Sequence, residues 1–267
     1  LLTWNDTDGK AAMWHSSAHL MAEAIELLYP GVKFGIGPDI ENGFYYDFDI
    51  NTKLTEDDLE KIEAKMREII ERNDSFQRQE LSKKQALDFF NDQKDEYKLE
   101  LIDGLDENTE DISIYGEGSF TDLCTGPHLP STGYIKYFKL LTVSGSYWRG
   151  DEHKARMQRI YGISFPKQKM LDDYVAFLEE AKKRDHRKLG KELDLFSIHE
   201  EAGAGLIYWH PKGARIRNEI EDFWKKEHLK NGYDLLYSPH IGKSQLWETS
   251  GHLSHFTENM YSPMDID

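Results

Sequence analysis

Two short stretches, His15-Ser-Ser-Ala-His19 and Cys124-Thr-Gly-Pro-His128, decide how this sequence is interpreted. His15 and His19 lie in a segment, 11–29, whose small and apolar residues follow the period of an amphipathic helix, so both imidazoles face one side of it. Cys124 and His128 lie in a Gly-Pro turn after a short segment typical of a strand end. Histidine and cysteine pairs at these spacings make either a metal site or a hydrolytic pocket.

The rest of the pattern predicts an α+β fold with two domains. Helices are expected over 11–29, 55–71 and 82–93, strands within 31–49 and over 134–143, and short, turn-rich structure over 99–118. Phe165-Pro166 ends a first domain, 1–165, and an apolar stripe then predicts a helical connector over 166–191. A second domain, 192–267, is expected to hold a helix at 213–229, an Asn231-Gly232 turn and a strand at 233–239.

The composition of the 267 residues limits the class of protein. The single cysteine excludes an intramolecular disulfide, and no run approaches the roughly 18 apolar residues that a membrane span requires. The first residues lack the basic and apolar regions of a signal peptide. A cytoplasmic protein without a membrane partner is therefore expected.

The net charge of −16 is spread unevenly along the chain. Residues 1–140 hold 29 acidic and 14 basic side chains, whereas residues 149–191 hold 12 basic and 7 acidic ones. The basic stretch 149–191 could hold a phosphate backbone, or it could be a solvated helix face.

The residues alone leave the chemistry of the histidine and cysteine pairs open. Three imidazoles and one thiolate satisfy the tetrahedral coordination of Zn²⁺, and four protein ligands would make a structural site. A metal-free cleft lined by the same four polar side chains is the alternative.

Further motifs follow in order along the chain. They are His15-Ser-Ser-Ala-His19, Gly43-Phe-Tyr-Tyr-Asp-Phe48, Asp122-Leu-Cys-Thr-Gly-Pro-His128, Tyr147-Trp-Arg-Gly-Asp151, Met157-Gln-Arg-Ile-Tyr-Gly162, Glu192-Leu-Asp-Leu-Phe196 and Tyr208-Trp-His-Pro-Lys-Gly213. Together they closely resemble bacterial-type threonyl-tRNA synthetases, which are class II aminoacyl-tRNA synthetases, over essentially the whole chain. The resemblance implies that 1–165 is the editing domain, also similar to that of alanyl-tRNA synthetases. It implies that 166–191 is the connector and 192–267 the truncated start of the class II antiparallel-sheet catalytic domain.

The resemblance also implies the site residues. They are His15, His19, Tyr46, Lys98, Asp122, Cys124 and His128. The alanyl-type domain uses such a constellation for zinc, whereas the threonyl-type domain is understood to hydrolyse without a metal, so no metal is expected here. Lys98 and His15 are expected to position or activate water, and Asp122, Cys124 and His19 to recognise the seryl group and the terminal ribose of a mischarged Ser-tRNA(Thr).

For the full-length enzyme the resemblance implies ATP-dependent attachment of threonine to tRNA(Thr), with Mg²⁺ and a catalytic Zn²⁺, and a homodimer. The segment 213–239 resembles the first class II signature, which lies at the dimer interface. The ATP-binding signatures and the catalytic zinc ligands should lie beyond Asp267, so no cofactor and no aminoacylation are expected of this fragment. His252 and His255 are not expected to be zinc ligands.

Two other functions remain as alternatives. A structural zinc module that binds RNA would use the four ligands to hold the fold and the basic stretch 149–191 for phosphate contacts. A free-standing deacylase that acts in trans would explain the pocket, but not the connector and the signature-like segment 213–239.

Overall fold

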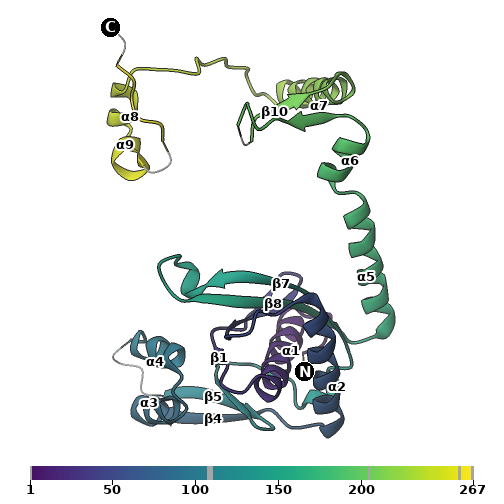
Figure 1. The fold of residues 1–267 in the computed structure, drawn as a ribbon, viewed down its shortest axis with the longest axis vertical. Helices are drawn as coiled ribbons and strands as arrows, with labels where there is room; N and C mark the ends of the chain where they lie inside the picture. Colours follow the sequence, from purple (N-terminus) through teal and green to yellow (C-terminus); the bar gives the residue numbers. More distant parts are fainter. Residues whose placement is uncertain (1, 107–110, 204, 258–259, 266–267) are drawn as a thin grey trace. The chain divides into compact units, whose positions relative to one another are not determined.

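The computed structural model describes residues 2–106, 111–203, 205–257 and 260–265 (Figure 1). The fold mixes helices and antiparallel sheets, as the sequence predicts. The chain divides into two compact units, 1–180 and 181–267. Every helix of the described residues is too short or too polar to cross a membrane.

Unit 1 is built around one long helix and two sheets. The helices are α1 (Thr7–Leu28), α2 (Glu56–Arg72), α3 (Lys83–Asp92), α4 (Glu96–Asp103) and α5 (Gln168–Lys183), which continues past the unit boundary. The strands are β1 (Lys33–Phe34), β2 (Asp39–Ile40), β3 (Gly43–Asp49), β4 (Gln77–Ser82), β5 (Asp111–Glu117), β6 (Phe120–Leu123), β7 (Tyr137–Tyr147) and β8 (Arg156–Phe165). Short 3-10 turns cover Thr132–Tyr134 and Trp148–Gly150.

The larger sheet has the order β1-β3-β8-β7, with β2 also paired to β3. Phe44, Tyr46 and Phe48 alternate along β3 and are fully buried. Helix α1 packs on β3 and β8 beside α2, and buries an apolar face that includes Leu20 (Figure 1). The main core lies between this sheet and the two helices.

The smaller sheet has the order β4-β5-β6 and packs against α3 and α4. The turn between β5 and β6 brings β6 against α1. Because Asp122 and Cys124 lie at the end of β6, this contact carries them to the histidines of α1.

The elements of unit 2 are α6 (His186–Glu192), β9 (Phe196–Ile198), β10 (Ile207–Trp209), α7 (Pro211–Lys230), α8 (Gln245–Thr249) and α9 (His252–His255). Strands β9 and β10 form an antiparallel pair against which α7 packs. The apolar side chains of α7 at 216, 220, 223 and 224 are each at least half exposed. The start of a class II catalytic domain in 192–267 stays a prediction.

Three expectations about single elements were wrong. Residues 99–118 hold most of α4 and the whole of β5 instead of only turns. The helical connector expected over 166–191 is not one continuous helix: it is interrupted after Lys183, and the Asp185 carboxylate caps a new helix by accepting the Arg187 N–H at 2.8 Å. Residues 233–239 join no sheet, since no strand among the described residues lies beside them.

Candidate functional site

The candidate residues converge on one pocket of about 520 Å³ in unit 1. Five of the seven predicted site residues line it: His15, His19, Lys98, Asp122 and Cys124. They come from α1, α4 and the end of β6, so elements distant in the sequence form the pocket together. Apolar residues, among them Ile36, Leu101 and Ile112, make up much of the remaining wall.

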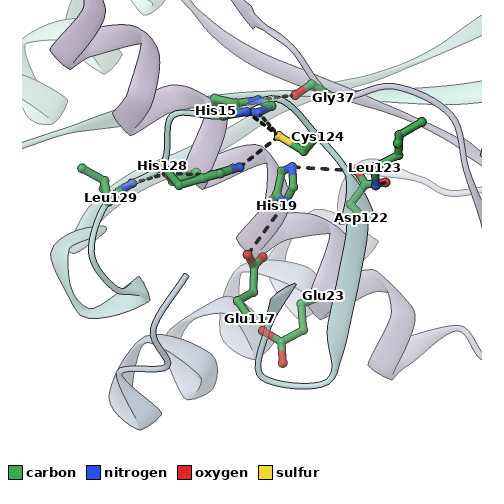
Figure 2. A network of polar contacts seen from close by, with 12 residues as sticks. His15, His19, Glu23, Gly37, Glu117, Asp122, Leu123, Cys124, His128 and Leu129 are labelled. Carbon is green, nitrogen blue, oxygen red and sulfur yellow. Dashed lines mark hydrogen bonds and ion pairs between the residues drawn. The ribbon is translucent and has the colours of Figure 1, made fainter. Parts of the chain in front are cut away.

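Cys124 is the centre of a hydrogen-bonded cluster (Figure 2). Its Sγ lies 2.8 Å from His15 Nε2 and 3.2 Å from His128 Nε2, and it accepts the Gly126 N–H at 3.2 Å. Burial raises the pKa of Cys124 to about 12, so the group is a thiol near neutral pH. Cys124 therefore serves as a donor and acceptor of hydrogen bonds and not as a ready nucleophile.

The hydrogen-bond directions around Cys124 form one consistent set. His15 donates Nδ1–H to the Gly37 carbonyl at 3.0 Å, which leaves Nε2 to accept the thiol proton. His128 then donates its Nε2–H to the Cys124 sulfur. Its Nδ1 accepts a hydrogen bond from the Ser16 hydroxyl at 3.0 Å. The same hydroxyl oxygen accepts the Leu129 N–H at 2.9 Å.

All three imidazoles of the cluster are held neutral. Burial lowers the pKa of His15, His19 and His128, and the neighbouring histidines lower those of His19 and His128 further. His128 stacks between the His15 and Phe76 rings, with ring centroids at 4.5 and 4.9 Å. Neutral imidazoles can accept protons, bind polar groups or bind a metal.

A buried ion pair forms the second part of the site. Lys98 Nζ lies 2.5 Å from Asp122 Oδ1 and donates to the Gly35 carbonyl at 2.7 Å. Tyr46 donates its hydroxyl to Asp122 Oδ2, and burial with the Asp122 charge raises the pKa of Tyr46 well above its usual value. Tyr46 is fully buried beneath Asp122, and His128 lies behind Cys124; neither residue lines the pocket.

Helix α4 positions Lys98 through its own cap. The Asp95 carboxylate accepts the N–H groups of Tyr97 and Lys98 at 3.1 and 3.2 Å. The first turn of α4 therefore holds the base of the Lys98 side chain, and the Gly35 carbonyl and Asp122 hold its end.

The four side chains His15, His19, Cys124 and His128 also fit a metal ion. Their ligand atoms lie within 4.8 Å of one another, and thiol and imidazole groups suit Zn²⁺. His15 Nδ1 is already held by a backbone carbonyl, as is usual for a metal-bound imidazole.

Sequence reasoning missed the groups that support the site. Ser16 lies within the first motif, but its bonds to His128 and Leu129 depend on tertiary contact. Glu117 is a fully buried acid on β5, five residues before Asp122, and lies 3.7 Å from His19 Nδ1. A strand predicted over 111–117 would have placed Glu117 on the buried face, but the turn-rich pattern of 99–118 did not indicate a strand.

Comparison with known proteins first identifies a class. Residues 112–161, which run from β5 into β8, match the family described as the threonyl and alanyl tRNA synthetase second additional domain. This part of the chain is therefore similar to a domain that threonyl and alanyl tRNA synthetases share.

The particular relatives are threonine–tRNA ligases. The chain is 54% identical to that of Cytophaga hutchinsonii and 54% identical to that of Caldanaerobacter subterraneus subsp. tengcongensis, in each case over 98% of its own length and 40% of the relative. It is 55% identical to that of Dehalococcoides mccartyi strain BAV1, over 96% of its own length and 43% of the relative. The resemblance to threonyl-tRNA synthetases is confirmed, and the chain spans about 40% of the length of these relatives.

Proposed function

We propose that unit 1 is an editing site that hydrolyses the ester of tRNA(Thr) mischarged with serine. The observation that carries this proposal is the pocket in which neutral imidazoles, a thiol and a buried Lys98–Asp122 pair meet. The chain's similarity to threonine–tRNA ligases supplies the substrate class. We further propose that the whole protein attaches threonine to tRNA(Thr), with ATP, Mg²⁺ and a zinc ion as its cofactors, in the cytoplasm.

Amino-acid size explains the need for such a site. Threonine exceeds serine by one methyl group, and burial of one carbon gives about 1 kcal/mol, or roughly tenfold in selection. That is too little for accurate translation. A second pocket that admits serine and excludes the extra methyl group provides the missing discrimination.

The proposed hydrolysis needs three functions: a positioned water, a group that takes its proton, and a donor to the developing oxyanion. Lys98 brings a positive charge into a pocket with largely apolar walls, where it can orient water or stabilise negative charge. His15 is the neighbouring neutral base, and it can take a proton from water when its Nε2 gives up the hydrogen bond from the Cys124 thiol. Asp122, Cys124 and His19 would bind the seryl group and the ribose, and no covalent intermediate is required.

The basic stretch 149–191 is proposed to contact tRNA, but several of its charges are already paired. Arg159 binds Asp47 through two nitrogens, at 2.7 and 2.8 Å, and Lys154 binds Glu100 at 2.7 Å. Arg187 binds Asp185. Phosphate contacts are therefore expected from fewer side chains than the composition alone implies.

The test compares release of serine from Ser-tRNA(Thr) with release of threonine from Thr-tRNA(Thr) after exhaustive chelation. Metal content is measured on the same sample. Selective serine release without metal supports the proposal, and His19→Ala should then leave more Ser-tRNA(Thr) intact while the fold is retained. Release that returns only with added Zn²⁺ would support a metal-dependent site at the same four residues.

A further inference from the structure

Four buried polar atoms behind the pocket have no hydrogen-bond partner among the described residues. They are His19 Nδ1, Glu23 Oε2 and both carboxyl oxygens of Glu117. All three side chains are at most 2% exposed. Buried polar groups are nearly always paired, so this cluster requires an explanation.

His19 lies between two carboxyl groups (Figure 2). Its Nδ1 is 3.7 Å from Glu117 Oε2, and its Nε2 is 3.8 Å from Asp122 Oδ2. A neutral imidazole carries one N–H and one lone pair, so it can donate to only one of the two carboxyl groups. The surroundings of the two carboxyl groups decide which one.

Asp122 holds the negative charge of this pair of carboxyl groups. It forms the ion pair with Lys98 and accepts the Tyr46 hydroxyl. A lone pair on His19 Nε2 would be repelled by this carboxylate, whereas an N–H is attracted to it. His19 therefore carries its proton on Nε2, and Nδ1 is left as an acceptor.

Glu117 is the group that can donate to Nδ1. No lysine or arginine among the described residues pairs with Glu117, and Arg72 pairs with Glu23 instead. Both of its carboxyl oxygens are buried and have no hydrogen-bond partner among the described residues, so an ionised carboxylate there would be left without a compensating charge or donor. Glu117 is thus a neutral carboxylic acid with an O–H to donate.

We propose that Glu117 is a positioning residue that donates its O–H directly to His19 Nδ1, and so holds His19 as an Nε2–H donor facing the pocket. The 3.7 Å separation closes to a hydrogen bond with a shift of less than about 1 Å. His19 then recognises an acceptor oxygen of the substrate, a carbonyl or a ribose oxygen, and does not act as the base. This inference rests on the proposed editing function.

The first experiment reads the tautomer of His19 directly. The full chain is labelled with ¹⁵N-histidine, chelated and studied by NMR at neutral pH, and the His19 signals are assigned by their absence in His19→Gln. The proposal expects a neutral ring with the proton on Nε2. A proton on Nδ1 would overturn it, because Glu117 would then be the accepting carboxylate that a metal-bound imidazole requires.

The second experiment uses matched variants at position 117. Glu117→Gln keeps a donor of the same shape and should retain the parent rate of serine release. Glu117→Met keeps the volume but removes the donor, and should lower the rate roughly tenfold and give a mixture of His19 tautomers. Glu63→Met is the control, since Glu63 is 4% exposed and binds Leu140 N–H at 2.9 Å outside the pocket.

Two results would contradict the donor role: a folded Glu117→Met protein with the parent rate and a single tautomer, or an equal loss in Glu117→Gln and Glu117→Met. The proposed function fails separately, if the parent protein releases no serine. The tautomer measurement still decides the inference in that case.

Discussion

For the buried ion pair of Lys98 and Asp122, removal of one partner should lower the free energy of unfolding much more than replacement of both by apolar residues. Each side chain is at most 5% exposed, and the two charges are 2.5 Å apart. Removing one partner leaves the other charge buried without compensation, which typically costs about 3–5 kcal/mol.

A mutant cycle tests this coupling. Lys98→Met and Asp122→Leu should each lower the free energy of unfolding by about 3–5 kcal/mol, and the double variant should lose much less than their sum. Urea titrations of the four proteins measure the effect. Strictly additive losses would show that the two charges do not interact.

The buried histidines predict a loss of stability in mild acid. Burial holds the pKa of His15, His19 and His128 below the value of about 6.5 expected in the unfolded chain. The unfolded state therefore binds protons first. Stability from these residues is complete above about pH 6.5 and falls as the pH drops further, towards the folded pKa values.

His128→Gln isolates one of these three contributions. It should reduce the slope of unfolding free energy between pH 6 and pH 5 by up to about 1.4 kcal/mol per pH unit. Glu26, whose pKa burial raises to about 7, opposes the slope but is present in both proteins and cancels in the difference. Identical slopes in urea titrations would mean that His128 is protonated in the folded state.

At the scale of elements, the β5–β6 turn positions both carboxyl groups that face His19. Gly118 has a positive φ of 53°, and a Cβ at this position would overlap Glu23 Oε1 and Arg72. The left-handed conformation therefore favours glycine at this turn, and an added Cβ would also force the ends of the Glu23 and Arg72 side chains to shift.

Gly118→Ala should destabilise the protein by about 1–3 kcal/mol and also slow serine release, because Glu117 and Asp122 flank the turn. Gly31→Ala is the matched control, since Gly31 has a φ of 88° with nothing within 4 Å of an added Cβ. Unfolding free energies and rates are compared for both. If Gly118→Ala and Gly31→Ala change the unfolding free energy and the rate equally, the positive φ alone accounts for the effect, and the contact with Glu23 and Arg72 does not contribute.

The sequence predicted the helices better than the strands. Helices α2 and α3 carry capping boxes, and their bounds were predicted to within one residue, whereas α1 begins four residues before its predicted start. Strand β4 received no prediction, because its mostly exposed polar residues show no apolar alternation. The segment 233–239 has the composition of a strand but no neighbour to pair with among the described residues.

The candidate site could also be predicted only in part from the sequence. His15, His19, Cys124 and His128 were found because local spacing and a family resemblance marked them. The chemistry of each depends on groups that only the tertiary structure supplies. Examples are the Gly37 carbonyl at His15 and the Glu117 carboxyl group at His19. Protonation states and hydrogen-bond directions follow from burial, which the sequence does not give.

At the scale of the whole molecule, the candidate site lies entirely within unit 1. A chain that ends after Lys183 keeps all seven site residues and retains Leu171 of α5, which packs against the main core. This shorter chain should keep the parent kcat for serine release. Its KM should rise, because part of the basic stretch 149–191 is lost. Steady-state kinetics separate these effects, and a large fall in kcat would place a required group in residues 184–267.

The position of Cys124 gives the protein a built-in reporter. It is the only thiol in the chain, it is 8% exposed, and burial raises its pKa to about 12, so almost none of it is thiolate at pH 8. A thiol-specific reagent therefore reacts appreciably only when the pocket opens and the thiol regains its ordinary acidity. The labelling rate, followed against denaturant concentration and with bound ligand, would measure the opening free energy of the pocket without any engineered probe.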